Sequence, residues 1–551
     1  MTLAVDPTTL AVVRGYMDEV VDEMDLVQVK AAFSSIVAEG NDRANGLFRV
    51  ESGDTVAQGR EGSPIFVAAM QYAVKAVVDW LQKIDRPWEP GDAYLLNDPF
   101  LGGTHLNDAK LVAPFFWEGE PLLLLANTGH WTDVGAAQAG AFSPTCRAIF
   151  EEGIRLPVMR FARGGEIDPE VLELIRANNR LPDMQEGDLR SQLNALEVGR
   201  RRLERLFDRY GAELVMACVS ELDLRSERLM EDRIAAIPDG TYTASDHLDD
   251  DGISERPIHL QVAITVEGRG MTIDFEGTDP LCEGPMNLAL PTTVSACYTS
   301  LKHTFPDIPI NAGCFRPVTL RVPSGSVLAA EPPHAVGGYS DVAGHVIALI
   351  SLALVQAVPE VAGAAAFQTG GVSVTSGQVD GHPFVATFPY GGGYGATYGS
   401  DGLIGGTNII GMARFPSIEM TEHEFPILWD RFGIRENSGG AGRWRGGCGT
   451  EYTFTVETDV MLSILGEQAT SPPQGVLGGE PGALNDVSYT VDGVWQRPAH
   501  GAKVPAVALH AGDKVRRCSP GGGGFGPPEE RDPALVERDL ALGYVSPSGA
   551  D

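Results

Sequence analysis

The sequence is poor in the features that mark nucleic-acid-binding, membrane-spanning and disulfide-rich proteins. It carries 41 Lys and Arg against 74 Asp and Glu, and the formal charge of −33 argues against sequence-independent nucleic-acid binding, which needs a basic face. Its 7 cysteines include no Cys-x-x-Cys pair, which suits a reducing compartment. No apolar run reaches the length of a membrane span, and the first residues lack a basic region followed by an apolar core. We therefore expect a cytoplasmic protein with neither a nucleic-acid nor a membrane partner.

A phosphate-binding loop is also missing. None of the glycine-rich stretches at 391–395, 438–447 and 521–526 follows a strand and opens a helix with a Gly-Lys-Ser/Thr sequence. Turns and bulges of a β-rich domain explain these glycines most simply, although the loops could also contact a partner subunit. The chain by itself is therefore not expected to bind ATP.

The composition is that of a soluble globular protein, with 551 residues of which 43% are hydrophobic and 21% charged. Apolar residues recur at helical spacing after Asp6-Pro7, and further helices are predicted over 187–206 and 344–357. Strand-like alternation begins near residue 242. These patterns predict a mixed, multi-lobed α+β fold, with an N-terminal α/β region that carries the metal site, a central helical block and a β-rich, glycine-rich part, which cover residues 1–150, 151–240 and 241–551.

The residues typical of a catalytic or metal-binding site are concentrated between positions 91 and 143. Two apolar runs in this stretch are joined by a short Gly-containing link, which predicts an antiparallel hairpin. A hairpin brings the residue before its first strand beside the residue after its second, so Asp108 and His130 should meet, with His105 close by. Two imidazoles and a carboxylate form part of a site for a divalent metal, and ordinary hydrogen-bonded residues are the alternative.

The same stretch resembles a known family. Residues 97–108 read Asn-Asp-Pro-Phe-Leu-Gly-Gly-Thr-His-Leu-Asn-Asp and residues 129–135 read Gly-His-Trp-Thr-Asp-Val-Gly, and both are similar to the signature of the hydantoinase B/oxoprolinase family. Ser438 to Gly447 resembles another of its patterns, and the resemblance runs from Asp6 to about Ser546. The family includes subunits of ATP-dependent hydantoinases, oxoprolinases and lactamases, and of acetone- and acetophenone-type carboxylases.

This resemblance implies a metal site with one acidic ligand from the N-terminal part. Asp42 matches that ligand, and Glu39 is the reserve because the chain departs from the family pattern around residues 39–43. Two nitrogen and two oxygen ligands suit zinc or manganese first, and iron or cobalt otherwise. The expected metal ligands are Asp42, His105, Asp108 and His130.

Three further residues are candidates for catalysis. Glu152 belongs to a family-like acidic stretch close to the metal ligands in sequence, with a helix-start acid as the alternative. Asp188 lies at the expected start of the long helical stretch. Gln192 matches a polar position of the family, in which this helix runs towards the active site.

The family's division of labour implies a partner and a choice of reactions. A separate hydantoinase A-type subunit binds and uses ATP to phosphorylate a carbonyl or amide oxygen, and the B-type subunit completes the reaction at its metal. We expect a hetero-oligomer with two copies of each subunit that opens a cyclic amide: a hydantoin, oxoproline or lactam. Carboxylation of a phosphorylated enol is the first alternative, and a non-catalytic assembly subunit is the second, to which the altered residues 39–43 lend some support.

Overall fold

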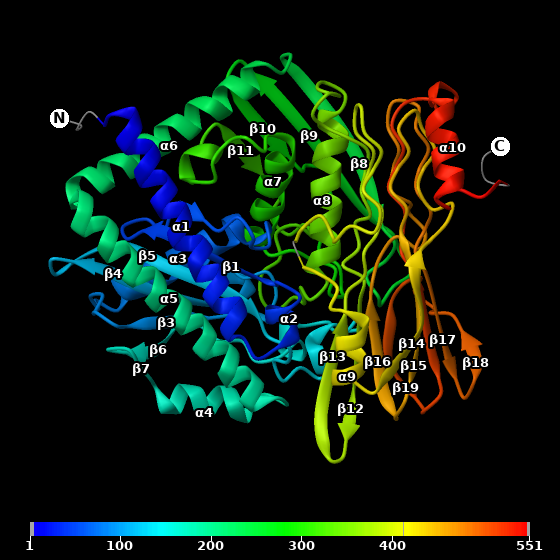
Figure 1. Cartoon of the computed structure of the whole chain (residues 1–551), viewed down its shortest axis with the longest axis horizontal. Coiled ribbons are helices and arrows are strands. Elements are labelled where there is room, and N and C mark those ends of the chain that lie inside the picture. The colour runs from blue at the N-terminus through cyan, green and yellow to red at the C-terminus, as the bar shows by residue number, and fades with distance from the viewer. Residues whose placement is uncertain (1–4, 412, 548–551) are drawn as a thin grey trace.

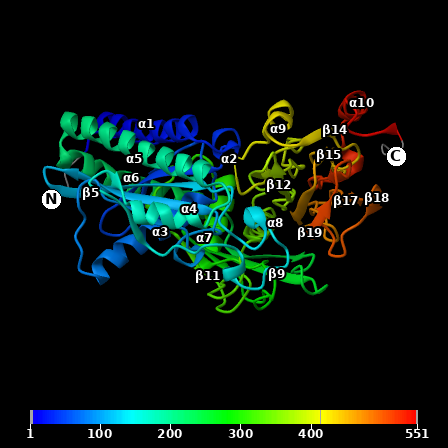
Figure 2. The ribbon, with the colours of Figure 1, turned by 90° about the horizontal axis from the view of Figure 1, so that it is seen from below.

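The computed structural model describes residues 5–411 and 413–547 and has a mixed α+β architecture, as predicted. The N-terminal helices and sheet lie at one end of the molecule, and the C-terminal strands lie at the other (Figures 1 and 2). Helix α8 and strands β8–β11 occupy the middle. Within the described residues, no helix has both the length and the apolar character needed to cross a bilayer.

The N-terminal part is built on a sheet that has seven strands among the described residues, in the order β2-β1-β5-β4-β3-β6-β7. Neighbouring strands in it are antiparallel, and the sheet continues past residue 150. Its strands are β1 (Arg43–Arg49), β2 (Thr55–Gln58), β3 (Ala93–Leu96), β4 (Asp108–Trp117), β5 (Glu120–His130), β6 (Met159–Arg163) and β7 (Glu166–Ile167).

Both faces of this sheet are covered. Along β5, Leu123 and Leu125 pack into a core with α1 and α5, whereas Leu124 and Ala126 pack on the opposite side with α3, as the two-residue period of a strand requires. Helix α5 begins at Pro182 and not at 187 as predicted, because proline is well tolerated at the first helical position. The helices of this part are α1 (Pro7–Ala31), α2 (Ser35–Ala38), α3 (Phe66–Lys83), α4 (Pro169–Ala177), α5 (Pro182–Tyr210) and α6 (Ala212–Ala235).

The middle of the molecule is a second sheet packed against buried helices. Its order is β11-β10-β9-β8, and α8 lies against both β8 and β9. Helix α8 begins at Tyr339, five residues before the predicted start, so the predicted range left out the first turn of the helix. The elements are β8 (Gly240–Leu248), β9 (Ile258–Glu267), β10 (Gly270–Asp274), β11 (Val318–Arg321), α7 (Leu290–Thr304) and α8 (Tyr339–Leu354).

Two further sheets form the C-terminal part, in the orders β13-β12-β16-β19 and β14-β15-β20-β17-β18. They share an apolar core that includes Phe388, Phe454 and Leu462. The elements are β12 (Val372–Val379), β13 (His382–Phe388), α9 (Ile418–Glu424), β14 (Ile427–Ile434), β15 (Thr450–Val456), β16 (Val460–Leu465), β17 (Asp486–Val491), β18 (Val494–Gln496), β19 (Val504–Leu509), β20 (Lys514–Cys518) and α10 (Pro533–Ala541). Short 3-10 turns occur at Pro99–Leu101 (η1), Ala139–Ala141 (η2), Ile149–Glu151 (η3), Ala312–Phe315 (η4) and Pro528–Glu530 (η5).

The three glycine-rich stretches are neither hairpin turns nor bulges, contrary to the prediction. They run beside one another and are joined by backbone hydrogen bonds: Gly393 N to Pro520 O (3.0 Å), Gly440 N to Gly522 O (2.8 Å) and Gly522 N to Gly447 O (2.9 Å). Backbones approach so closely here that a Cβ atom on Gly522 would lie 1.9 Å from the carbonyl oxygen of Tyr394. These segments therefore order one another within the chain and need no partner subunit to do so.

Candidate metal centre

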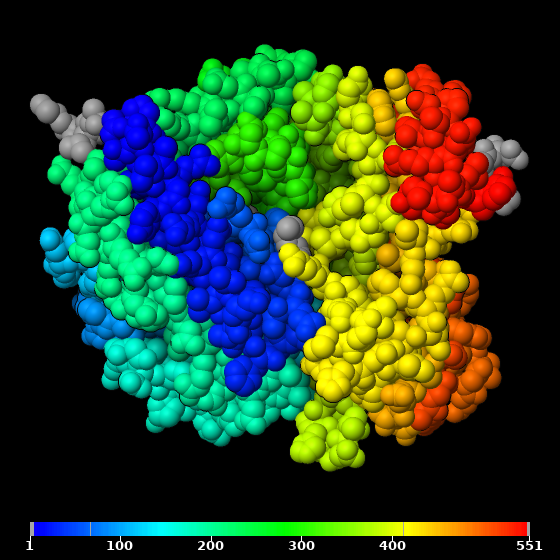
Figure 3. Space-filling model, viewed as in Figure 1, coloured from blue at the N-terminus to red at the C-terminus, as the bar shows by residue number. Residues whose placement is uncertain are grey.

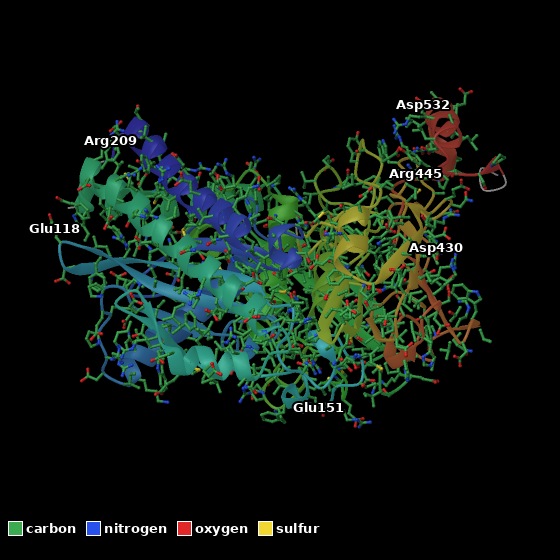
Figure 4. The ribbon with its side chains drawn as sticks, turned by 60° about the horizontal axis from the view of Figure 1, so that its bottom comes forward. Glu118, Glu151, Arg209, Asp430, Arg445 and Asp532 are labelled. Carbon is green, nitrogen blue, oxygen red and sulfur yellow. The ribbon has the colours of Figure 1, made fainter. Side chains whose placement is uncertain are left out.

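The β4–β5 hairpin predicted from the sequence is confirmed, and it sets the spacing of the site. Asp108 is the first residue of β4, His130 is the last of β5, and the two are direct partners in the antiparallel ladder. Glu118 and Gly119 make the connecting turn with φ values of 51° and 90°, and Glu118 lies at the far tip of the hairpin (Figure 4). One end of the hairpin thus presents a carboxylate and an imidazole side by side.

A tight loop before β4 supplies the second imidazole. Asp98 caps the turn η1 by accepting a hydrogen bond from Phe100 N (3.0 Å), and the chain then passes through Gly102 at a φ of 133°. A Cβ atom on Gly102 would lie 2.1 Å from the backbone nitrogen of Ala73 in α3, so only glycine allows the loop to press against that helix. The loop therefore places His105 at the end of the hairpin.

The four expected metal ligands converge. His105 Nε2 lies 3.3 Å from both His130 Nδ1 and Asp108 Oδ2. His130 Nδ1 lies 3.3 Å from Asp108 Oδ1 and 3.5 Å from Asp42 Oδ2. His105, Asp108 and His130 are buried, whereas the Asp42 side chain is 21% exposed. The structure therefore brings one donor atom each from His105, Asp108 and His130 within 4.8 Å of one another, where one ion could lie, and Asp42 faces the same nitrogen of His130.

The donor set fits a divalent cation. Asp108 Oδ2 accepts a short hydrogen bond from the Thr104 hydroxyl, whereas Asp108 Oδ1 is buried and accepts none from the described residues. A buried carboxylate oxygen without a donor is costly unless a cation binds it. Two neutral imidazoles and two carboxylates also carry a charge of about −2, which matches a divalent ion.

The ionisation of the cluster follows from its burial and its charges. Burial raises the pKa of Asp42, although His130 opposes this. Burial opposes charge on Asp108 too, but the nearby imidazoles of His105 and His130 hold its pKa well below the usual range. Burial lowers the pKa of His105, whereas the two carboxylates outweigh burial at His130 and raise its pKa. The unlike pKa shifts of the two imidazoles are what two carboxylates placed asymmetrically would cause.

A cavity of about 120 Å³ lies beside the cluster. Asp42 and His130 line it on the metal side, together with Tyr339, the first residue of α8. The remaining walls come mainly from apolar residues of the N-terminal part, of β12 and β13 and of residues 407–416, and they include Ile36, Ile65, Phe142, Val372, Val385, Ile410 and Phe425. A small, mostly apolar molecule would therefore meet the polar cluster at one wall.

Comparison with known proteins gives the family. The hydantoinase B/oxoprolinase family matches residues 6–528. The chain belongs to this family. Caprolactamase subunit beta of Pseudomonas jessenii is 31% identical over 99% of this chain and 95% of that protein. The 5-oxoprolinase 1 of Arabidopsis thaliana is 27% identical over 95% of this chain, but the match covers 42% of that longer protein.

Solved structures of two relatives share the fold. The crystal structure of the ATP-dependent caprolactamase from Pseudomonas jessenii aligns with a TM-score of 0.91 and 29% identity, over 100% of this chain and 96% of that chain. A nucleotide-free acetone carboxylase also aligns with a TM-score of 0.91, at 20% identity, over 99% of this chain and 79% of that chain. This hydantoinase B-family chain is thus similar in sequence and fold to a caprolactamase subunit, and it shares its fold with an acetone carboxylase.

Of the two acidic candidates in the N-terminal part, the structure places Asp42 at the cluster. The turn after α2 brings Asp42 to the edge of β1, where its Oδ1 accepts a hydrogen bond from the Ser63 hydroxyl (3.2 Å) and its Oδ2 faces His130. Glu39 lines a separate surface pocket beside Arg60. Asp42 is therefore the acid positioned to complete the metal site.

The three candidates for catalysis are not among the residues that line the cavity. Glu152 accepts hydrogen bonds from the backbone nitrogens of Val336 (3.2 Å) and Gly337 (2.7 Å), and so holds the segment that leads to Tyr339. Burial raises the pKa of Glu152 to about 7. Its contacts therefore position a wall of the cavity from a distance.

Asp188 and Gln192 likewise contact backbone near the site. Asp188 Oδ1 accepts hydrogen bonds from Phe33 N (2.8 Å) and Ser34 N (3.1 Å), which fixes the start of α2 ahead of Asp42. Gln192 Nε2 donates to Ala109 O (3.1 Å) and to the side chain of Asn127 (3.2 Å), which ties α5 to the metal-binding end of the hairpin.

Several residues of the site were not predicted. Tyr339 lies with its ring 4.7 Å from that of His105, and burial raises its pKa well above the usual range, so it stays a phenol. The buried Lys110 donates to Asp108 O (2.8 Å). A lysine inside an apolar strand is a signal that could have been noticed, because such a charge needs a nearby partner. For Tyr339, only the two preceding glycines hinted at a close approach.

Proposed function

We propose that this chain is the metal-dependent catalytic subunit of a two-component, ATP-dependent amidohydrolase. It would open a cyclic amide, such as a hydantoin, oxoproline or lactam, after a partner subunit has phosphorylated that amide. The observation that carries this proposal is the convergence of two histidines and two aspartates beside a small cavity with apolar walls. The ring of a cyclic amide suits those walls, and its carbonyl suits the polar cluster.

The residues around the cluster have defined tasks in such a reaction. A divalent ion held by Asp42, His105, Asp108 and His130 would supply Lewis-acid chemistry, polarising a carbonyl and lowering the pKa of water. Thr104 orients the carboxylate of Asp108, and Phe142 stacks on His130 with ring centroids 6.0 Å apart, so the cluster is screened from bulk water on that side. The neutral phenol of Tyr339 is a hydrogen-bond donor beside the cavity, suited to an oxygen that gains negative charge.

The proposed partner is a hydantoinase A-type subunit that binds and uses ATP, in a complex with two copies of each subunit. Two observations support a partner. The similar caprolactamase chain is a beta subunit, and 5-oxoprolinase 1 is more than twice as long as the region matched here. The absence of a P-loop sequence agrees with ATP being used elsewhere.

A second candidate function is carboxylation of a phosphorylated ketone enol, in which the metal would orient carbon dioxide. The fold shared with acetone carboxylase favours it. Hydrolysis is preferred because identity to the caprolactamase subunit is 31%, against 20% to the carboxylase. A non-catalytic assembly role is the third candidate, and the grouping of His105, Asp108 and His130, with Asp42 beside His130, argues against it.

The deciding experiment is turnover by the metal-loaded chain together with its A-type partner. A lactam, a hydantoin and an aryl ketone with bicarbonate are supplied in parallel with ATP, and the products are quantified. We expect ring opening of a cyclic amide that needs ATP, both subunits and the metal. Carboxylation of the ketone alone would select the second candidate, and the absence of turnover with all three substrates would support the third.

A further inference from the structure

Beyond the metal cluster, the cavity has a second polar feature formed by residues distant in sequence. Asn408 and Arg414 line it from the segment that follows the glycine-rich residues 391–406. In the space-filling view, this part of the chain meets the N-terminal part near the middle of the visible face (Figure 3). Packing within the chain does not account for the polar groups that these two side chains carry.

The backbone around these residues is tied to the metal site. Ile65 N donates to Ile410 O (2.9 Å), and Arg414 N donates to Gly40 O (2.7 Å). Gly40 lies two residues before the metal ligand Asp42. Hydrogen bonds on both sides therefore hold this wall at a set distance from the cluster.

Asn408 has a fixed orientation and an unused donor. Its side-chain oxygen accepts a hydrogen bond from Ile410 N (3.0 Å), which determines which way the amide points. Its side-chain nitrogen is buried and has no hydrogen-bond partner among the described residues. A buried amide donor without an acceptor is unfavourable, so an acceptor that arrives with a ligand would stabilise it.

Arg414 adds an unpaired positive charge nearby. It is exposed, and its guanidinium forms neither an ion pair nor a hydrogen bond with any residue that the structure describes. Arg414 also lines a surface pocket that contains Glu39 and Glu61, and neither carboxylate forms an ion pair with it. An arginine that lines the same cavity as a free amide donor is suited to an anionic oxygen group.

We propose that Asn408 and Arg414 form an anion-binding subsite. This subsite would bind a carboxylate or phosphate group of the substrate while the metal cluster acts on the carbonyl group of the same substrate. The inference rests on the proposed function for the identity of the substrate, and it assigns that substrate to the class of small molecules with an apolar body and one oxyanionic group. Asn408 donates to one oxygen of the group, and Arg414 supplies the opposite charge. The remaining apolar walls accept the body of the molecule.

Binding of simple anions to the metal-loaded chain tests this without the partner subunit or turnover. Inorganic phosphate and acetate are titrated by calorimetry into the wild type, Arg414→Gln and Asn408→Asp. The last variant keeps the acceptor for Ile410 but places a negative charge where the donor was. We expect at least one anion to bind, about tenfold more weakly to Arg414→Gln and still more weakly to Asn408→Asp, with metal content unchanged.

Arg228→Gln on α6 is the matched control, because Arg228 is exposed and also has no ion pair among the described residues. It should bind like the wild type. Preference for phosphate points to a phosphoryl group as the natural feature, and preference for acetate points to a carboxylate. Binding that is absent in the wild type, or equal in all variants because the anion sits on the metal, would overturn the inference. Failure of cyclic-amide turnover would instead count against the proposed function alone.

Discussion

At the scale of single residues, the carboxylate of Asp108 is held so that its two oxygens have different partners. Thr104 donates to one oxygen, and the other faces His130 without a hydrogen bond from the described residues. The site is therefore preorganised for a cation, because the carboxylate need not rotate on binding. The nearby polar residues 152, 188 and 192 support this arrangement through the backbone.

Removing one imidazole should remove the metal. We expect His105→Ala to lose most bound metal while remaining folded, because two nitrogen ligands are reduced to one and the remaining donors come from the same hairpin end and from Asp42. Elemental analysis after purification and circular dichroism check the two parts. His510→Ala, at an exposed histidine, is the control and should keep its metal. Wild-type metal content in His105→Ala would contradict the assignment.

Glu152 should make stability depend on pH. Its pKa is raised by burial to about 7 in the folded chain, against a reference of 4.5, so the folded state binds the proton more tightly than the unfolded state. Stability from this group is therefore present below the unfolded pKa and is lost as pH rises through about 7, by roughly 3 kcal/mol in total. Urea unfolding at pH 5.5 and 7.5 should show a smaller loss for Glu152→Gln than for the wild type. Equal losses would refute the prediction.

At the scale of elements, the hairpin and the glycine-rich segments are stabilised in different ways. In the β4–β5 hairpin, apolar side chains on both faces are buried by helices on either side of the sheet. In the glycine-rich segments, the absence of side chains lets backbones from residues 391–395, 438–447 and 521–526 lie against one another. Helix α10 lies over these segments near Arg445 (Figure 4). Its Asp539 pairs with the buried Arg445 (3.1 Å).

A single added methyl group should disrupt the packing of the three glycine-rich segments. In Gly522→Ala the Cβ atom would lie 1.9 Å from Tyr394 O, and backbone atoms cannot move aside without breaking neighbouring hydrogen bonds. We expect a loss of roughly 3 kcal/mol or more in the free energy of unfolding, measured by urea denaturation. Gly433→Ala in β14 is the control, because its Cβ atom would meet nothing within 4 Å, and its effect should stay within about 0.5 kcal/mol. Similar effects of the two substitutions would rule out tight backbone packing.

At the scale of the whole molecule, a buried charge network joins the middle to the C-terminal sheets. Lys503 Nζ lies 3.4 Å from Asp250 Oδ1 at the end of β8 and forms a short ion pair with the buried Glu467 after β16. Asp249 N donates to the same Glu467 (2.8 Å). In a chain with a formal charge of −33, the buried Lys503 thus offsets the negative charge of the acidic residues at this junction.

Loss of that lysine should weaken the junction. In Lys503→Met, Glu467 would remain buried without its lysine and Asp250 would keep only His500, and we expect the free energy of unfolding to fall by about 3–5 kcal/mol. Chemical denaturation measures this. Lys514→Met removes an exposed ion pair with Asp430 and should cost no more than about 1 kcal/mol. A Lys503→Met protein as stable as the wild type would show that the network does not hold the parts together.

The sequence alone determined the local elements and the part of the site that one hairpin carries. Two apolar runs joined by a short Gly-containing link predict β4 and β5, and the geometry of a hairpin then requires Asp108 and His130 to be neighbours. Helical periodicity predicted α1, and it predicted α5 and α8 within five residues of their observed bounds. Asp42 needed the additional resemblance to a family, because no local pattern connects it to residue 130.

Only the tertiary structure decided which distant residues complete the cavity and how the glycine-rich segments pair. Tyr339, Asn408 and Arg414 reach the site from segments more than 200 residues away from the hairpin, and their position follows from burying α8 and from backbone hydrogen bonds such as Arg414 N to Gly40 O. Glycine allows close approach to any backbone, so its spacing in the sequence does not specify the partner. Local periodicity follows from bond geometry, whereas these contacts depend on the whole core being packed at once.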